Sequence, residues 1–195
     1  MNVPPQGVSR WRRHLTGPAG AAAALAWGFM EGMLFFIVPD VLLTLTALFD
    51  FKSAWRQTLL AVAGSLAAGA VLFTWAVHSP ENAARVVTAV PFVRPAMVER
   101  VRSDLAEAGP YALLRGPLSG IPYKLYAVEA PAVMGLGAFL AISVPARLER
   151  LVTGLLLFGA AGWFFRRGIQ AHPRRAAVGH MIYWIVVYAC YWIPL

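Results

Sequence analysis

The chain has 195 residues, of which 59% are hydrophobic and 13% are charged, and its mean hydropathy is +0.61. Soluble domains carry about 25% charged residues, so these values exclude an ordinary soluble domain and predict an all-α integral membrane protein. The net charge of +8 lies largely in short basic flanks, at 10–13, 166–167 and 174–175. Such flanks are typical of the cytoplasmic ends of membrane segments, and we expect no nucleic-acid partner.

The first apolar segment, residues 19–49, fits neither one membrane span nor two. It is apolar apart from two acidic residues, Glu31 and Asp40. As one helix it would be about 46 Å long, whereas the hydrocarbon core is about 30 Å thick and two spans need about 40 residues. We predict a re-entrant hairpin that breaks near Gly32 to Pro39 and leaves on the side where it entered. One strongly tilted, kinked helix is the alternative.

The segments around this hairpin have simpler interpretations. Residues 1–18 combine prolines with a basic segment and predict a short cytoplasmic lead-in at the membrane interface. Residues 53–78 contain an apolar run long enough for one full span. Residues 79–109 alternate apolar and charged positions at helical spacing, and Pro91 and Pro95 divide them. They predict two short amphipathic helices that lie on the membrane surface.

The second half of the chain repeats the organisation of the first. Residues 110–144 are too long for one span and contain three prolines, so we predict a second re-entrant hairpin that enters from the opposite face. Full spans are predicted at 147–165 and 176–195. The two halves are then residues 19–78 and 110–170. Three full spans place the N-terminus in the cytoplasm and the C-terminus outside, in agreement with the basic flanks.

The two predicted hairpins contain similar stretches of opposite charge. The first stretch begins with Glu31 and ends with Asp40, and the second, 84 positions later, begins with Arg115 and ends with Lys124. Each has a proline near its end, and three of ten positions are identical. Chance similarity is the alternative explanation. Ionisable groups are costly inside apolar segments and usually have a function there.

Two hairpins of inverted topology would place a binding site at the middle of the membrane. In this interpretation Arg115 and Lys124 bind an anionic phosphate, and Glu31 and Asp40 are counter-charges, either of which could take up a proton. Glu129 is a second-rank candidate for the same site. The alternative is that these charges form static ion pairs between the hairpins. The predicted hairpin breaks are Gly32, Pro39, Gly116, Gly120 and Pro122.

Other kinds of site lack the residues they need. The single cysteine, Cys190, excludes an internal disulfide and a cysteine-based metal site. Ser119 and Ser143 have no histidine or carboxylate partner in a hydrolase arrangement, and there is no nucleotide-binding glycine loop. We therefore expect no cofactor, no metal and no enzymatic activity. Arg147 and Arg150 are interpreted as anchors of a span end. Four histidines at segment ends are interpreted as interfacial: His14, His78, His172 and His180.

Three motifs together resemble the DedA family, also called the VTT or SNARE-associated Golgi protein superfamily. They are an early Glu-Gly in a broken apolar segment, Arg115 followed by Gly-Ile-Pro-Tyr-Lys at 120–124, and Ser-Val-Pro-Ala-Arg-Leu-Glu-Arg at 143–150. The resemblance covers about residues 20–170. It implies paired re-entrant hairpins, movement of undecaprenyl phosphate or phospholipids between leaflets, and functional roles for Glu31, Asp40, Arg115 and Lys124.

The chain departs from the usual motif of that family. Its second hairpin normally carries a tighter Gly-Arg-Phe-x-Pro-x-x-Arg, whereas the basic pair here is nine positions apart and ends in Lys124. This predicts a short, divergent bacterial member. The function we expect is a lipid flippase or scramblase of the inner membrane, with membrane lipid as its partner and proton coupling as a further hypothesis. A secondary transporter that uses the same carboxylates for a small ion is the alternative.

Overall fold

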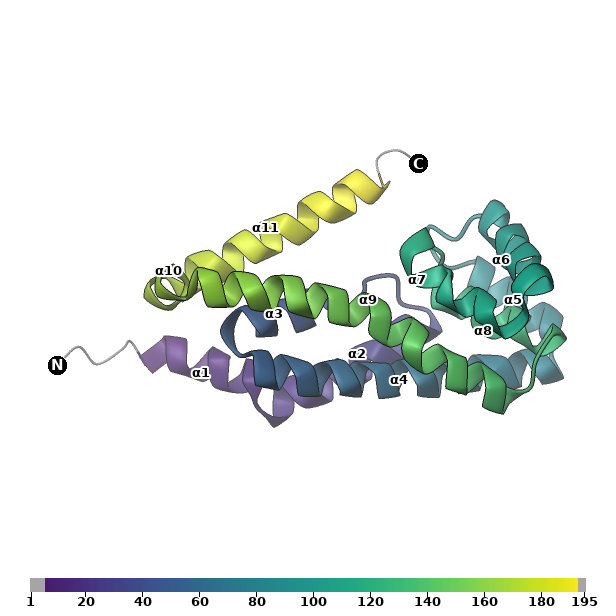
Figure 1. Cartoon of the computed structure of the whole chain (residues 1–195), viewed down its shortest axis with the longest axis horizontal. Coiled ribbons are helices and arrows are strands. Elements are labelled where there is room, and N and C mark those ends of the chain that lie inside the picture. Colours follow the sequence, from purple (N-terminus) through teal and green to yellow (C-terminus); the bar gives the residue numbers. More distant parts are fainter. Residues whose placement is uncertain (1–5, 193–195) are drawn as a thin grey trace.

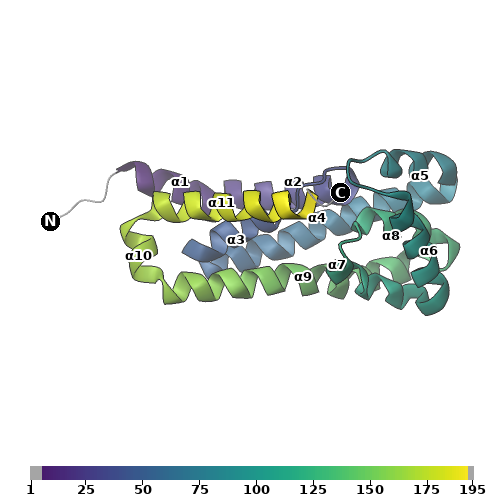
Figure 2. The same cartoon turned by 90° about the horizontal axis from the view of Figure 1, so that it is seen from above.

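The computed structural model describes residues 6–192, and every regular element in that range is a helix. The helices α4 and α9 run along the long axis of an elongated molecule (Figure 1). The shorter helices α5 to α8 gather at one end, while α1 and α10 lie at the other. From α10, α11 turns back toward the centre (Figure 2). The elements are α1 (Gln6–Thr16), α2 (Pro18–Met33), α3 (Asp40–Phe49), α4 (Phe51–His78), α5 (Pro80–Thr88), α6 (Pro95–Ala108), η1 (Gly109–Leu114), α7 (Gly116–Ser119), α8 (Tyr123–Glu129), η2 (Ala130–Ala132), α9 (Leu136–Phe164), α10 (Arg166–Ala171) and α11 (Pro173–Trp192).

The helices α2 and α4 pack with their backbones in contact, and glycine on both helices makes this possible. A Cβ atom on Gly28 would lie 2.1 Å from the carbonyl oxygen of Ala61, and one on Gly64 would lie 2.2 Å from that of Leu25. No larger residue fits at either position without separating the helices. This close packing fixes the end of α2, which carries Glu31, against the middle of the molecule.

The predicted break in the first apolar segment is confirmed. The helix α2 ends one residue after Gly32, and α3 begins directly after Pro39, so residues 34–39 form a non-helical loop. Two side chains bind the backbone groups that this loop frees: Trp27 Nε1 donates to Ile37 O and Val38 N donates to Tyr188 Oη, each at 2.9 Å. A loop of this kind can lie inside a protein because its polar groups have partners.

The connector between the halves contains two helices, as predicted. Pro80 and Pro95 each occupy the first residue of a helix, where the missing N–H of proline costs nothing. The buried faces of α5 and α6 carry Val87, Val98 and Val101, which join one hydrophobic core with residues of α4, α8 and α9. The remaining faces are charged and exposed.

The structure corrects the predicted division of the second half. The sequence suggested a hairpin that ends at 144 and a separate span at 147–165, but α9 is one continuous helix from Leu136 to Phe164, with Pro145 inside it. Proline removes one backbone hydrogen bond and often ends a helix; here the helix continues through it. The residues after Pro145 therefore share one helix with those before it.

The residues of the predicted second hairpin, 110–144, that precede α9 form short helical pieces. Gly116 begins α7, and Gly120 ends it with a backbone φ of +75°, in the left-handed region that favours glycine. Pro122 comes directly before α8. All three predicted break residues of this half thus lie at helix ends.

One helix in the described part of the chain, α4, is both long enough and apolar enough to cross a membrane. The 29-residue α9 would be about 43 Å long, but Arg147, Glu149 and Arg150 interrupt its apolar sequence. The predicted last span, 176–195, corresponds to α11, which begins at Pro173; residues 193–195 lie outside the described range, as do residues 1–5 of the predicted lead-in.

Candidate functional site

Five charged side chains come together where α2, α3, α8 and α9 meet. Glu31, Asp40, Lys124 and Arg147 are buried, and Arg150 is partly exposed. A buried charge is costly unless it is paired and hydrogen-bonded. The partners of each group therefore show what the cluster can do.

The first ion pair joins Glu31, on the last turn of α2, to Arg147 in α9. Arg147 Nη2 donates to Glu31 Oε2, and both side chains are only 6% exposed. Arg147 Nε donates to Ser65 Oγ at 3.2 Å, and its guanidinium carbon lies 5.1 Å from the centre of the Tyr123 ring. These contacts connect α2, α4, α8 and α9 through one arginine.

The second ion pair joins Asp40, the first residue of α3, to Arg150. Arg150 Nη2 lies 2.8 Å from Asp40 Oδ2, and the arginine side chain is 30% exposed. Arg147 and Arg150 are three positions apart on α9, so they lie on one face of that helix. The helix α9 thus carries the arginine partners of both carboxylates, Glu31 at the end of α2 and Asp40 at the start of α3.

Lys124, on α8, is the remaining cation of the cluster. Its Nζ donates to Phe35 O at 2.8 Å, and that oxygen belongs to the loop 34–39. This bond links α8, from the second half of the chain, to the loop between α2 and α3. An ammonium group has three donors, and Phe35 O is the one hydrogen-bond acceptor found for it among the described residues. Since each carboxylate has its own arginine, the cluster has an excess positive charge at Lys124.

A cavity of about 410 Å³ opens beside these charges. Glu31, Lys124 and Arg150 line it, and the other lining residues are mainly apolar or aromatic groups from the loops 34–39 and 90–93 and from α11. A positively charged cavity with apolar walls suits an anionic group that carries apolar chains.

Phe92 lies at this cavity in a strained backbone conformation. Its φ of +68° is in the left-handed region, which costs a non-glycine residue about 1–3 kcal/mol. Its ring lies 5.7 Å from that of Phe36, and both residues line the cavity. The surrounding packing therefore holds this part of the wall in a defined position.

An apolar groove of about 740 Å³ adjoins the cavity. It runs between α2 and α11, and almost all of the surface that faces it is apolar. Phe35, Trp184 and Tyr188 line both the groove and the charged cavity. The two spaces therefore meet at these three aromatic residues.

Two of the predicted site residues lie elsewhere. Arg115 is 53% exposed, and its Nη1 lies 3.5 Å from Glu107 and 3.9 Å from Asp104. Glu129, the last residue of α8, accepts from Arg102 of the connector at 3.0 Å, and this hydrogen bond raises the pKa of Arg102. The prediction that Arg115 opposes the carboxylates is wrong, because Arg147 and Arg150 occupy that place. Glu31, Asp40 and Lys124 do come together as expected.

His180 is another residue whose environment differs from the prediction. The sequence predicts it at an interface, but it is buried in the third turn of α11. Its Nε2 lies 2.8 Å from Thr44 Oγ1 and 3.2 Å from Trp184 Nε1, while its buried Nδ1 has no hydrogen-bond partner among the described residues. Together with the hydrogen bond from Val38 N to Tyr188 Oη, these contacts attach α11 to α3 and to the loop 34–39.

Comparison of the chain with protein families, with curated proteins and with solved structures gives no match. The resemblance to the DedA family stays a prediction that rests on the sequence motifs alone.

Proposed function

We propose that this chain is a membrane transporter that moves a lipid phosphate, such as undecaprenyl phosphate or a phospholipid, between the leaflets of a bacterial inner membrane. The observation that carries the proposal is the unneutralised charge of Lys124 beside a cavity that adjoins an apolar groove. A lipid phosphate has the matching parts, an anionic headgroup and apolar chains.

The headgroup would bind at Lys124 and at the exposed side of Arg150. Lysine provides free ammonium donors, and a guanidinium can bind two phosphate oxygens at once. Arg147 is less available, because Glu31, Ser65 and the Tyr123 ring already surround it. The chains of the lipid would lie in the apolar groove or in the adjacent membrane.

The same contacts weigh against the small-ion alternative. A transported cation would need a free carboxylate, but Glu31 and Asp40 are each paired with an arginine. At Glu31 a cation would have to displace the Arg147 guanidinium, which Ser65 and the Tyr123 ring also contact. The arrangement therefore favours an anionic ligand.

In this proposal the chain crosses the membrane several times, and the loops 34–39 and 120–122 lie inside the bilayer as the tips of re-entrant hairpins. Backbone of this kind is tolerated at membrane depth where it is buried in protein or lines a wet cavity. The N-terminus is cytoplasmic and the C-terminus is outside, as the basic flanks suggest.

Leaflet exchange of a fluorescent lipid phosphate in proteoliposomes tests the proposal. Lys124→Gln should reduce the exchange rate at least tenfold, because it removes the unneutralised charge and keeps a hydrogen-bond donor for Phe35. Arg115→Gln is the matched control, since it removes a cation outside the cluster, and it should leave the rate unchanged. Equal rates for both variants would refute the assignment of the site.

Two further readouts of the same vesicles separate the alternatives. Release of free phosphate from the lipid would favour an enzyme that cleaves lipid phosphates. An ion current or a change in internal pH without lipid exchange would favour the secondary transporter. The proposal expects intact lipid in both leaflets.

A further inference from the structure

The net positive charge of the molecule is confined to one end. Nine of the 17 Lys and Arg lie in α1, in residues 49–56 and in residues 163–176, and the one acidic residue in these segments is Asp50. The rest of the chain holds eight basic and eight acidic residues. We call the three segments together the basic end; α1 and α10 both lie at this end of the molecule in the two views (Figures 1 and 2).

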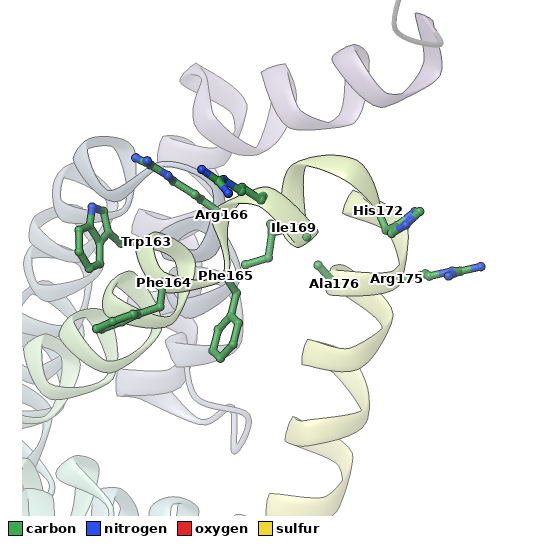
Figure 3. A pocket seen from close by; sticks show the side chains of 10 residues that line it. Trp163, Phe164, Phe165, Arg166, Ile169, His172, Arg175 and Ala176 are labelled. Atoms are coloured by element: carbon green, nitrogen blue, oxygen red, sulfur yellow. The ribbon is translucent and has the colours of Figure 1, made fainter.

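Two hollows at the basic end share Arg166. The larger, about 770 Å³, lies inside the turn from α9 through α10 to α11, with Trp163, Phe164 and Phe165 on the α9 side and His172 and Arg175 on the α11 side (Figure 3). The smaller, about 230 Å³, lies between this turn, α1 and the junction of α3 with α4, and Arg12 and Arg166 both line it.

The four arginines of the turn, at positions 166, 167, 174 and 175, are exposed. None of them forms an ion pair with another described residue, and no acidic residue follows Glu149 in the sequence. Their charges are therefore available to a ligand outside the chain, and guanidinium groups bind phosphate oxygens in pairs.

Three consecutive aromatic residues indicate the kind of ligand. Trp163, Phe164 and Phe165 are 65–72% exposed, directly before the first two arginines of the turn. Large exposed apolar surfaces mark interaction sites, and aromatic rings beside basic residues are typical of the headgroup level of a membrane. Bases of a nucleic acid also stack on aromatic rings beside arginines, but these three rings end a long apolar helix, and such a helix end is typical of the headgroup level of a membrane.

We propose that the basic end is a second lipid site, which binds the phosphate groups of anionic membrane lipids, with Arg166 as its central contact. The site lies at the opposite end of α9 from the connector and shares no residue with the charged cavity. It requires that this end meets a lipid surface, and it does not require that the chain transports lipid.

Native mass spectrometry of the detergent-purified full chain tests this site with dioleoyl phosphatidylglycerol and dioleoyl phosphatidylcholine, which have the same chains. All variants are made in a Lys124→Gln background, so that the contribution of the central cavity is reduced and is the same in every variant. A basic residue near a lipid surface contributes about 1 kcal/mol, or about fivefold in affinity. Arg166→Gln should weaken phosphatidylglycerol binding about fivefold, and Arg166→Gln with Arg175→Gln about 25-fold.

The controls separate the site from general charge effects. Arg85→Gln removes an exposed arginine at the other end and should change nothing, and Arg166→Lys should retain most of the affinity. Equal binding of the two lipids, or equal effects of Arg166→Gln and Arg85→Gln, would overturn the proposal. Displacement of phosphatidylglycerol by a short single-stranded oligonucleotide would assign the basic end to nucleic acid instead.

Discussion

Replacement of Arg147 by methionine tests how the central cluster is held together. The change leaves the Glu31 carboxylate buried at the end of α2, without its ion pair, and removes a bond to Ser65 and a contact with the Tyr123 ring. Loss of one partner of a buried pair costs about 3–5 kcal/mol, because the other charge is left uncompensated. Both side chains are only 6% exposed. We therefore expect the free energy of unfolding to decrease by about 3–5 kcal/mol.

The assay is reversible unfolding in detergent micelles, followed by the fluorescence of the seven tryptophans. Glu31→Leu combined with Arg147→Met removes both charges, and we expect it to recover at least 2 kcal/mol relative to Arg147→Met alone. If the loss in Arg147→Met is below about 0.5 kcal/mol, or if the double variant is no more stable than the single one, the carboxylate is not buried and paired as described.

The double variant also decides between a static and a functional pair. A variant that is stable and still exchanges lipid at the normal rate would show that the pair only connects helices. Stability with loss of exchange would show that the charges take part in transport, which is the result we expect, because Glu31 lines the cavity together with Lys124 and Arg150.

Four further substitutions have graded expectations, all measured by the same unfolding assay. Gly28→Ala should lower the free energy of unfolding by about 1–3 kcal/mol or more, because its Cβ clashes with α4. Gly137→Ala should be neutral or stabilising, because a Cβ there meets nothing within 4 Å. Similar effects at both positions would contradict the packing of α2 against α4. Asp40→Asn should cost about 1–2 kcal/mol, less than Arg147→Met, because water reaches Arg150; a larger loss would contradict this order. Arg102→Ala breaks an exposed pair and should cost less than about 1 kcal/mol; a greater cost would show that the connector depends on it.

The sequence alone predicted where the chain breaks and three of the buried charges. Gly32, Pro39, Gly120 and Pro122 lie at helix ends because glycine and proline act through local backbone geometry. Local rules of this kind do not need the tertiary structure. They also placed the two amphipathic helices of the connector.

The arginine partners could not be read from the same rules. Pro145 suggested a helix boundary, so Arg147 and Arg150 were assigned to the end of a span, although α9 passes through the proline and carries both to the centre. Their spacing of three, within an otherwise apolar helix, was the available signal. Arg115 matched Glu31 in sequence position, but it follows a short 3₁₀ helix and lies beside the acidic residues of α6.

The burial of His180 also could not be predicted from the sequence pattern, because it depends on where α11 begins. Because the predicted span began at 176, the histidine was placed near its end, whereas α11 begins at Pro173 and packs this side chain against α3. His180 and Trp184, four positions apart, share one helix face, and that spacing could have indicated a buried polar contact.

Photo-cross-linking tests the central claim most directly, because it locates the lipid. A lipid phosphate with a diazirine in its apolar tail is added to the purified protein in detergent. The sample is illuminated, and the modified residues are identified by mass spectrometry. We expect labels in the groove between α2 and α11, at Met30, Met181 and Ile185, with less labelling in Lys124→Gln. Labels confined to the outer faces of α4 and α9, for example at Val71 and Leu157, and unchanged in that variant, would contradict the account.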